Sequence, residues 1–169
     1  AQMSPMDAWL LMIGLETLPV RMEAHVRNAR AIAEFLQARP EVTWVSYPGF
    51  SSHPRYHLLD RYLPRGAGSV FTFGIRGGRD AGRRFIDALE LWSHVANVGD
   101  TKSLVIHPAS TTHSQLSDAE MLAAGVAPES IRLSVGLEDI DDLTWDLDNA
   151  LRAACHPEPV EGSDHEVPA

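Results

Sequence analysis

The densest group of side chains that could do chemistry lies in residues 100–114. Hydroxyls, two imidazoles and the chain's one lysine, Lys102, flank a short apolar run at residues 104–106. Polar loops at the ends of buried strands often carry binding and catalytic sites, although turns favour hydroxyl residues as well. A serine–histidine nucleophile pair is conceivable here. Because the chain has no nucleophile-elbow sequence, the pattern disfavours a serine hydrolase.

A single arginine, Arg132, stands in an otherwise apolar and small-residue run, residues 131–136 (IRLSVG). Arginine is rarely buried without a partner, and its planar fork suits two-pronged binding of a carboxylate. Two interpretations are open from the strand alone. Arg132 either binds the carboxylate of a ligand or forms a structural ion pair with one of the chain's many acidic residues.

Other clusters favour structural roles. His53 and His57 are four residues apart, but no acid lies between them as in zinc proteases, so we interpret them as surface histidines. Cys155 is interpreted as a small packing residue. An acidic cluster follows residue 137, and we expect it to cap a helix and to form a solvated face rather than a metal site. Its members are Glu138, Asp139, Asp141, Asp142, Asp146 and Asp148.

The elements that must position these residues alternate between strands and helices. A helix begins at Ser4-Pro5 and is expected to reach Arg39 with a kink at Pro19. Strands are predicted at residues 42–47, 69–75, 91–98, 104–106 and 131–135. Helices are predicted at residues 53–63, from Asp80 to 89, after the capping box 117–120, and after Asp139. This alternation predicts an α/β fold, an α+β sandwich in which helices cover a sheet.

Three segments follow from these elements. We expect residues 1–40 to form a long helix that either spans a domain or links two domains, residues 41–154 to form one domain, and residues 155–169 to form a disordered tail. The first helix is expected to expose an apolar face that nothing covers, so the chain is predicted to associate.

Charge and composition narrow the function classes. The net charge is −9, which disfavours nucleic acids and anionic membrane surfaces as partners. No apolar run reaches the roughly 18 residues that span a bilayer. One cysteine cannot build a disulfide framework, so we expect a cytoplasmic protein.

Three segments resemble a known family in the right order. Residues 97–113 (NVGDTKSLVIHPASTTH), residues 131–142 (IRLSVGLEDIDD) and residues 4–22 (SPMDAWLLMIGLETLPVRM) are similar to the Cys/Met-metabolism enzymes that depend on pyridoxal 5'-phosphate (PLP). The sequence of residues 103–113 most resembles the O-acetylhomoserine sulfhydrylase branch. The resemblance covers residues 1–154 and implies the C-terminal small domain of a fold-type I PLP transferase.

The resemblance also implies roles for two residues. Arg132 matches the arginine that holds the substrate's α-carboxylate, and Ser103 matches a residue beside the bound amino acid. The family's Schiff-base lysine and cofactor-binding large domain match nothing in this chain, and Lys102 matches a different position. We therefore expect no catalytic or cofactor-binding residue in this chain, no metal, and no activity from the chain alone.

The implied activity is replacement of the acetate of O-acetyl-L-homoserine by sulfide or a thiol, giving homocysteine or methionine. The family further implies a small-molecule amino-acid substrate and a homo-oligomer, typically a tetramer. Two alternatives stay open at this point. One is a cystathionine or methionine γ-lyase or γ-synthase of the same family, and the other is a stand-alone domain without catalysis.

Overall fold

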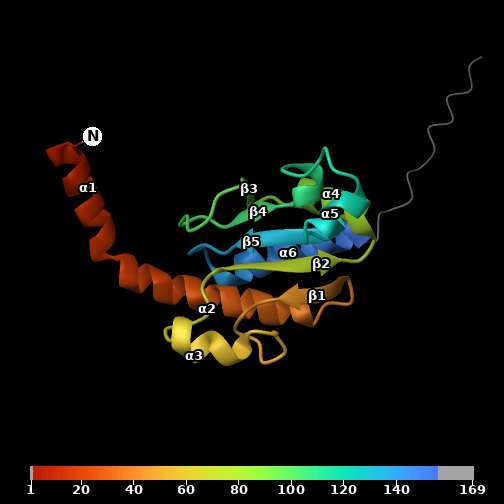
Figure 1. The fold of residues 1–169 in the computed structure, drawn as a ribbon, viewed down its shortest axis with the longest axis horizontal. Coiled ribbons are helices and arrows are strands. Elements are labelled where there is room, and N and C mark those ends of the chain that lie inside the picture. The colour runs from red at the N-terminus through yellow and green to blue at the C-terminus, as the bar shows by residue number, and fades with distance from the viewer. Residues whose placement is uncertain (1, 156–169) are drawn as a thin grey trace, which may run out of the picture.

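The computed structural model describes residues 2–155 of the 169 (Figure 1). Its elements alternate between helices and strands along the chain, as the sequence predicts. In chain order they are α1 (Pro5–Glu16), α2 (Leu18–Gln37), β1 (Val42–Ser46), η1 (Tyr56–Leu58), α3 (Leu59–Tyr62), β2 (Val70–Ile75), α4 (Gly78–Ala88), β3 (Ser93–His94), β4 (Leu104–Ile106), η2 (Pro108–Ser110), α5 (Asp118–Ala123), β5 (Ser130–Ser134) and α6 (Ile140–Cys155).

The five strands form one sheet in the order β1-β2-β5-β4-β3. Neighbouring strands are antiparallel except β3 and β4, which run parallel. Strand β5, which carries Arg132, therefore lies at the centre of the sheet. The mixed sheet with helices packed against it confirms the predicted α+β fold class.

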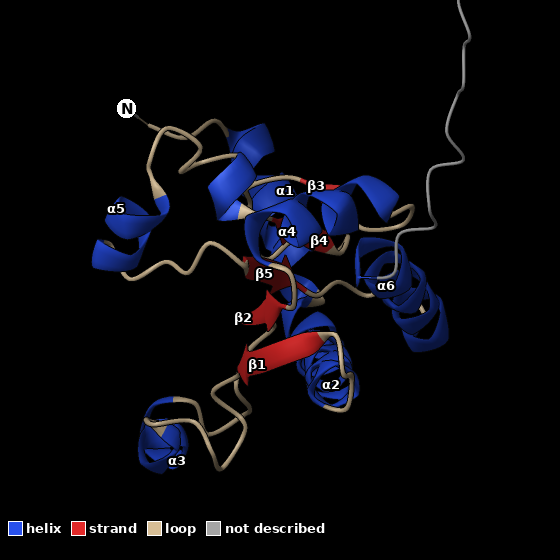
Figure 2. Cartoon of the chain, turned by 90° about the vertical axis from the view of Figure 1, so that its right-hand side faces the viewer, coloured by secondary structure: helices blue, strands red, loops and turns tan. Residues whose placement is uncertain are grey.

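The long helices α2, α4 and α6 pack on one face of this sheet (Figure 2). Alternate strand residues such as Phe73, Ile131 and Leu133 point into that layer and are fully buried. Phe73 meets Phe85 of α4 edge to face, with ring centroids 5.7 Å apart. The remaining strand residues face the other side, where no long helix among the described residues packs.

The first helical segment differs from the expected single kinked helix. The helix is interrupted at Thr17, which separates α1 from α2, and Pro19 lies in the first turn of α2. A proline in the first turn removes no helical hydrogen bond, because the N–H groups there have no partner within the helix. A new helix that starts at this point therefore costs less than a continuous helix kinked at Pro19. Arg21 donates to the carbonyl of Gly14 and to the hydroxyl of Thr17, which satisfies acceptors left at the break.

The two helices have different environments. No residue of α1 is buried, and Figure 1 shows α1 projecting away from the sheet. Its large apolar side chains, among them Trp9, Leu10 and Ile13, are 45–63% exposed, which confirms the predicted uncovered apolar surface. By contrast, α2 buries Ile32 and Leu36 in the core shared with residues 41–154. Among the described residues, no helix combines the length and the apolar character that crossing a bilayer requires.

Several predicted boundaries were wrong. Helix α4 begins at Gly78 with Gly77 as its N-cap, so Asp80 lies in the first turn and is not the cap. Gly77 has φ of +98°, a conformation that glycine adopts at little cost, and this moves the start forward. The predicted helix at 53–63 is reduced to η1 and α3, and the strand at 91–98 to Ser93–His94. Cys155 ends α6, and the rest of the predicted tail lies outside the described residues.

Candidate functional site

Arg132 lies on the sheet face that the long helices leave open. In the ladder it is opposite Thr72 of β2 on one side and Ile106 of β4 on the other. Its neighbours in sequence, Ile131 and Leu133, point into the buried layer. Strand alternation therefore directs the guanidinium away from the core, and its side chain is only partly covered.

A pocket of about 410 Å³ lies at Arg132. The sheet forms its floor through Trp44, Ser46, Thr72, Ser130 and Arg132, and residues 108 and 125–127 form its rim. Most of the side chains that form the floor are small and polar. Arg132 is the one cationic residue in this lining. A small anionic ligand fits this arrangement better than an apolar one.

The guanidinium has one protein partner in the part of the chain that the structure describes. Nη2 of Arg132 donates to the backbone carbonyl of Asn97 over 3.2 Å. Within residues 2–155 no carboxylate pairs with it, although Arg30, Arg39 and Arg79 all have acidic partners. The structural ion pair considered from the sequence is therefore not formed there. Its other N–H groups remain for a ligand.

Ser103 lies elsewhere. Leu104 is opposite Ser134, so its side chain shares the face of Arg132, and the preceding Ser103 lies on the opposite side. The Ser103 side chain is fully buried. Its hydroxyl donates to Oε2 of Glu138 over 2.8 Å and accepts from the Gly136 N–H over 2.8 Å. The structure thus does not bring the hydroxyl of Ser103 and the guanidinium of Arg132 together.

The backbone around Ser103 is held equally firmly. The Ser103 N–H donates to Oε1 of Glu138 over 2.7 Å, so one carboxylate binds both donors of this residue. Gly136 lies so close that a Cβ there would meet the Ser103 nitrogen at 2.5 Å. Only glycine fits at residue 136. The close approach and the bonds of Ser103 hold the residue before β4 against the residues that follow β5.

Helix α2 anchors the same exit from β5. Nδ1 of the buried His25 donates to the Val135 carbonyl over 2.7 Å, because a carbonyl can only accept. Nδ2 of Asn28 donates to the carbonyls of Gly136 and Glu138 over 3.2 and 3.1 Å. These bonds fix the end of the strand that carries Arg132. Neither residue could be predicted from the sequence as an anchor of β5, because nothing in a helical apolar pattern marks a partner more than 100 residues away.

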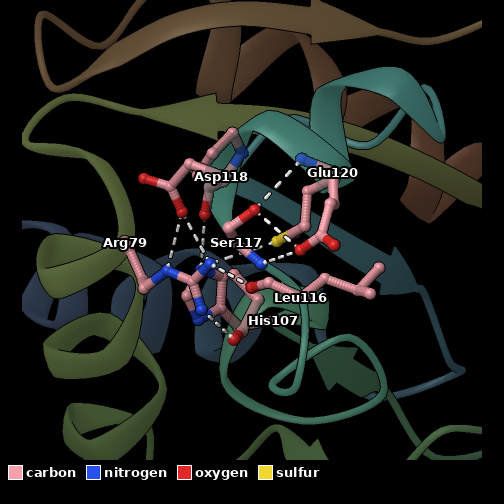
Figure 3. A network of polar contacts seen from close by, with 9 residues as sticks. Arg79, His107, Leu116, Ser117, Asp118 and Glu120 are labelled. Atoms are coloured by element: carbon pink, nitrogen blue, oxygen red, sulfur yellow. Dashed lines mark hydrogen bonds and ion pairs between the residues drawn. The ribbon is translucent and has the colours of Figure 1, made fainter.

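The rim of the pocket is held by a polar network centred on Arg79 of α4 (Figure 3). Its guanidinium donates to Asp118 at 2.6 Å, to the Ala109 carbonyl at 2.6 Å and to the Leu116 carbonyl at 3.2 Å. Ser117 and Glu120 form the predicted capping box that starts α5. Arg79 therefore ties α4 to both η2 and α5.

His107 completes this network as a structural residue. Its Nε2 donates to the Pro128 carbonyl over 2.9 Å, so Nδ1 accepts from the Ser110 hydroxyl. Burial is the main cause that lowers the pKa of His107. The hydrogen bond to the Pro128 carbonyl opposes this change, whereas the nearby charges of Arg79, Arg83 and His94 lower the pKa further. The neutral ring is the form that this site holds.

The remaining polar residues of the 100–114 segment are mostly at the surface. Lys102, Thr112 and Ser114 are exposed, and none of them lines the Arg132 pocket. The Asp100 carboxylate accepts the Lys102 N–H over 3.1 Å, and this backbone hydrogen bond is the main cause of its lowered pKa. These exposed side chains therefore add no group to the Arg132 pocket.

The acidic cluster after residue 137 was only partly interpreted correctly. Asp139 does accept the Asp141 N–H at the start of α6. Glu138 instead holds Ser103, and Asp148 pairs with Arg39 and Arg152. Asp146 is 1% exposed and accepts the N–H groups of residues 90–92 over 2.8–3.2 Å. Helical spacing alone could not reveal these partners, because they come from distant segments.

Comparison with known proteins gives consistent results. The Cys/Met metabolism PLP-dependent enzyme family matches residues 1–152. O-acetyl-L-homoserine sulfhydrylase from Leptospira meyeri is 53% identical over 150 residues, which are 88% of this chain and 34% of that protein. O-acetyl-L-homoserine sulfhydrylase 1 from Thermus thermophilus is 51% identical over 149 residues, 88% of this chain and 35% of that protein.

A solved structure is also similar. A putative O-acetylhomoserine (thiol)-lyase from Campylobacter jejuni, crystallised with N'-pyridoxyl-lysine-5'-monophosphate, superposes with a TM-score of 0.80 at 44% identity. The match covers 90% of this chain and 36% of that one. This chain thus spans about a third of the length of the proteins that it matches.

Proposed function

Since this chain belongs to the Cys/Met metabolism PLP-dependent enzyme family, we propose that it is the substrate-binding part of an O-acetyl-L-homoserine sulfhydrylase. The proposed reaction replaces the acetate of O-acetyl-L-homoserine by sulfide or a thiol, so that homocysteine or methionine and acetate result. The observation that carries the proposal is Arg132, a guanidinium on an open pocket with no carboxylate partner among the described residues.

Arg132 supplies binding and orientation in this proposal. The planar guanidinium can hold both oxygens of an α-carboxylate. Two parallel hydrogen bonds fix the direction of the Cα–carboxylate bond and hence the direction of the Cα–H bond. Such fixed geometry lowers the entropic part of the barrier in any step at Cα.

The described residues fit the substrate and not the cofactor. A Schiff base requires an amine, and the chain's one lysine, Lys102, is exposed and does not line the pocket. The chain spans about a third of the relatives' length, which supports the proposal that the cofactor-binding residues belong to the part of such an enzyme that this chain does not match.

The proposal extends to assembly and location. We expect a homo-oligomer, a tetramer by resemblance to the family, that acts in the cytoplasm on a small-molecule amino acid. The single cysteine supports a reducing compartment, because the chain cannot form an internal disulfide. The net charge of −9 supports a small-molecule substrate over nucleic acid.

The first test is the intact mass of the native protein after borohydride reduction. We expect a mass more than twice that of these 169 residues, with PLP fixed on a lysine other than Lys102. A mass equal to that of these residues with no PLP attached contradicts the proposal and leaves a stand-alone domain.

The second test is the Arg132→Lys variant of the native enzyme. Lysine keeps the charge and loses the fork, so we expect kcat/KM for O-acetyl-L-homoserine to fall by roughly 100-fold. Arg30→Lys is the matched control, because Arg30 is exposed and its one ion pair among residues 2–155 is with Glu34. Homocysteine formation with sulfide separates a sulfhydrylase from a γ-lyase, which releases a 2-oxo acid from methionine or cystathionine.

A further inference from the structure

We propose that Ser134 is a positioning residue for Arg132 and that it acts through the loop between β3 and β4. This inference rests on the proposed function, because it concerns how the carboxylate-binding guanidinium is held. Two residues of β5 each form a hydrogen bond with one residue of this loop. Arg132 and Ser134 of β5 bind Asn97 and Gly99 of the loop, respectively.

Ser134 and Arg132 point to the same face of the sheet, because they are two residues apart in one strand. Oγ of Ser134 accepts the Gly99 N–H over 3.1 Å, and the Asn97 carbonyl accepts Nη2 of Arg132 over 3.2 Å. Ser134 is 1% exposed, so its hydroxyl has a fixed environment. The loop therefore bridges the strand at two points, with Arg132 at one and Ser134 at the other.

The loop has little else to hold it. Every residue from 94 to 100 is exposed, so none is anchored by burial of a side chain. Its shape depends on a turn in which Oδ1 of Asn97 accepts the Val98 N–H over 2.9 Å and Gly99 adopts φ of +77°. Further along, the Thr101 carbonyl accepts the Leu137 N–H. Between His94 and Thr101, the bond from Gly99 is the loop's attachment to a buried side chain.

Loss of the Ser134 hydroxyl should therefore affect Arg132 indirectly, through the loop between β3 and β4. Without that acceptor, Gly99 separates from β5 and the Asn97 carbonyl moves with it. The long arginine side chain then loses the one acceptor that restricts its rotamers in the described structure. A clamp that is less ordered before binding has a weaker affinity, although its charge and its other N–H groups are unchanged.

The test compares Ser134→Val with Ser134→Thr in the native enzyme. The two side chains have the same shape and differ only in the hydroxyl, so any effect of the added methyl group is common to both. We expect Ser134→Val to lower kcat/KM for O-acetyl-L-homoserine by about tenfold, mostly through KM, as expected for one lost hydrogen bond. Ser134→Thr should retain most of the activity, and Ser114→Ala, at an exposed residue that does not line the Arg132 pocket, should leave KM unchanged.

A second readout does not depend on turnover. In NMR spectra of the full chain, the Gly99 amide should exchange faster with solvent in Ser134→Val than in Ser134→Thr, and the guanidinium signal of Arg132 should broaden. The proposal is overturned if the two variants have equal KM values or if exchange at Gly99 is the same in both. Absence of turnover in the wild-type enzyme would refute the proposed function instead, and the NMR comparison would then decide the positioning role alone.

Discussion

Replacing Ser103 by alanine separates a structural role for this residue from direct contact with substrate. The hydroxyl of Ser103 makes two buried or partly buried hydrogen bonds, one to the Glu138 carboxylate and one from the Gly136 N–H. Alanine removes both and leaves the Gly136 N–H without an acceptor. Because the residue is fully buried, water cannot readily replace the hydroxyl.

The size of the effect follows from these two bonds. A buried N–H left unsatisfied costs about 1–3 kcal/mol, and a hydrogen bond to a charged group contributes about 1.5–3 kcal/mol. Glu138 is partly exposed and recovers some of its loss through water. We therefore expect Ser103→Ala to lower the free energy of unfolding by about 2–4 kcal/mol, a large share of the ~5–15 kcal/mol typical of a domain.

Urea unfolding of the full chain, followed by tryptophan fluorescence, measures this difference. The midpoint should fall while the slope stays constant, because the surface exposed on unfolding is unchanged. Ser114→Ala is the control, since Ser114 is exposed and its substitution should change stability by less than about 0.5 kcal/mol. A Ser103→Ala loss below about 1 kcal/mol, together with a raised KM in the native enzyme, would refute the structural role and favour direct substrate contact.

Asp146→Ala should lower the free energy of unfolding by about 3–5 kcal/mol in urea titrations, because three N–H groups lose a buried carboxylate acceptor; a loss no larger than that of exposed Asp141→Ala would contradict this. Because burial lowers the pKa of His107, the unfolded state binds a proton at a higher pH than the folded state does. The contribution of His107 to the free energy of unfolding should therefore be fully present above about pH 6.5 and should decrease as the pH falls below that value. His107→Gln should weaken that dependence in unfolding curves measured between pH 7 and pH 5, and an identical pH profile would count against it. The full chain should associate at micromolar concentration through the apolar surface of α1, and exchange of Trp9 and Leu10 for glutamine should shift its light-scattering mass toward the monomer; an unchanged mass would place the contact elsewhere.

Local signals in the sequence predicted the features that depend on near neighbours. The cap at Ser4, the capping box at residues 117–120 and the strand around Arg132 are all present, because each is decided within a few residues. The resemblance to a family, tied to three ordered motifs, also predicted the fold class. Its assignment of Ser103 and Arg132 to the substrate stays a prediction.

Features that depend on distant partners could not be predicted in this way. Ser103 contacts Glu138 across 35 residues, and Asp146 binds a turn more than 50 residues earlier. In the sequence both acids belong to a run of carboxylates that looks like a solvated helix start. The contact that orients Arg132 comes from the Asn97 carbonyl, and backbone groups carry no signature of residue type.

The anchoring of β5 by α2 also affects when the pocket can form during synthesis. The bond from His25 to the Val135 carbonyl spans 110 residues, and those from Asn28 span 108 and 110. At about 5–20 residues per second, a ribosome needs roughly 5–20 s to add that length of chain. Through that interval the buried face of α2 has no strand end to bind. Contacts of such wide separation also slow refolding, so the arginine site should form late, after the local helices.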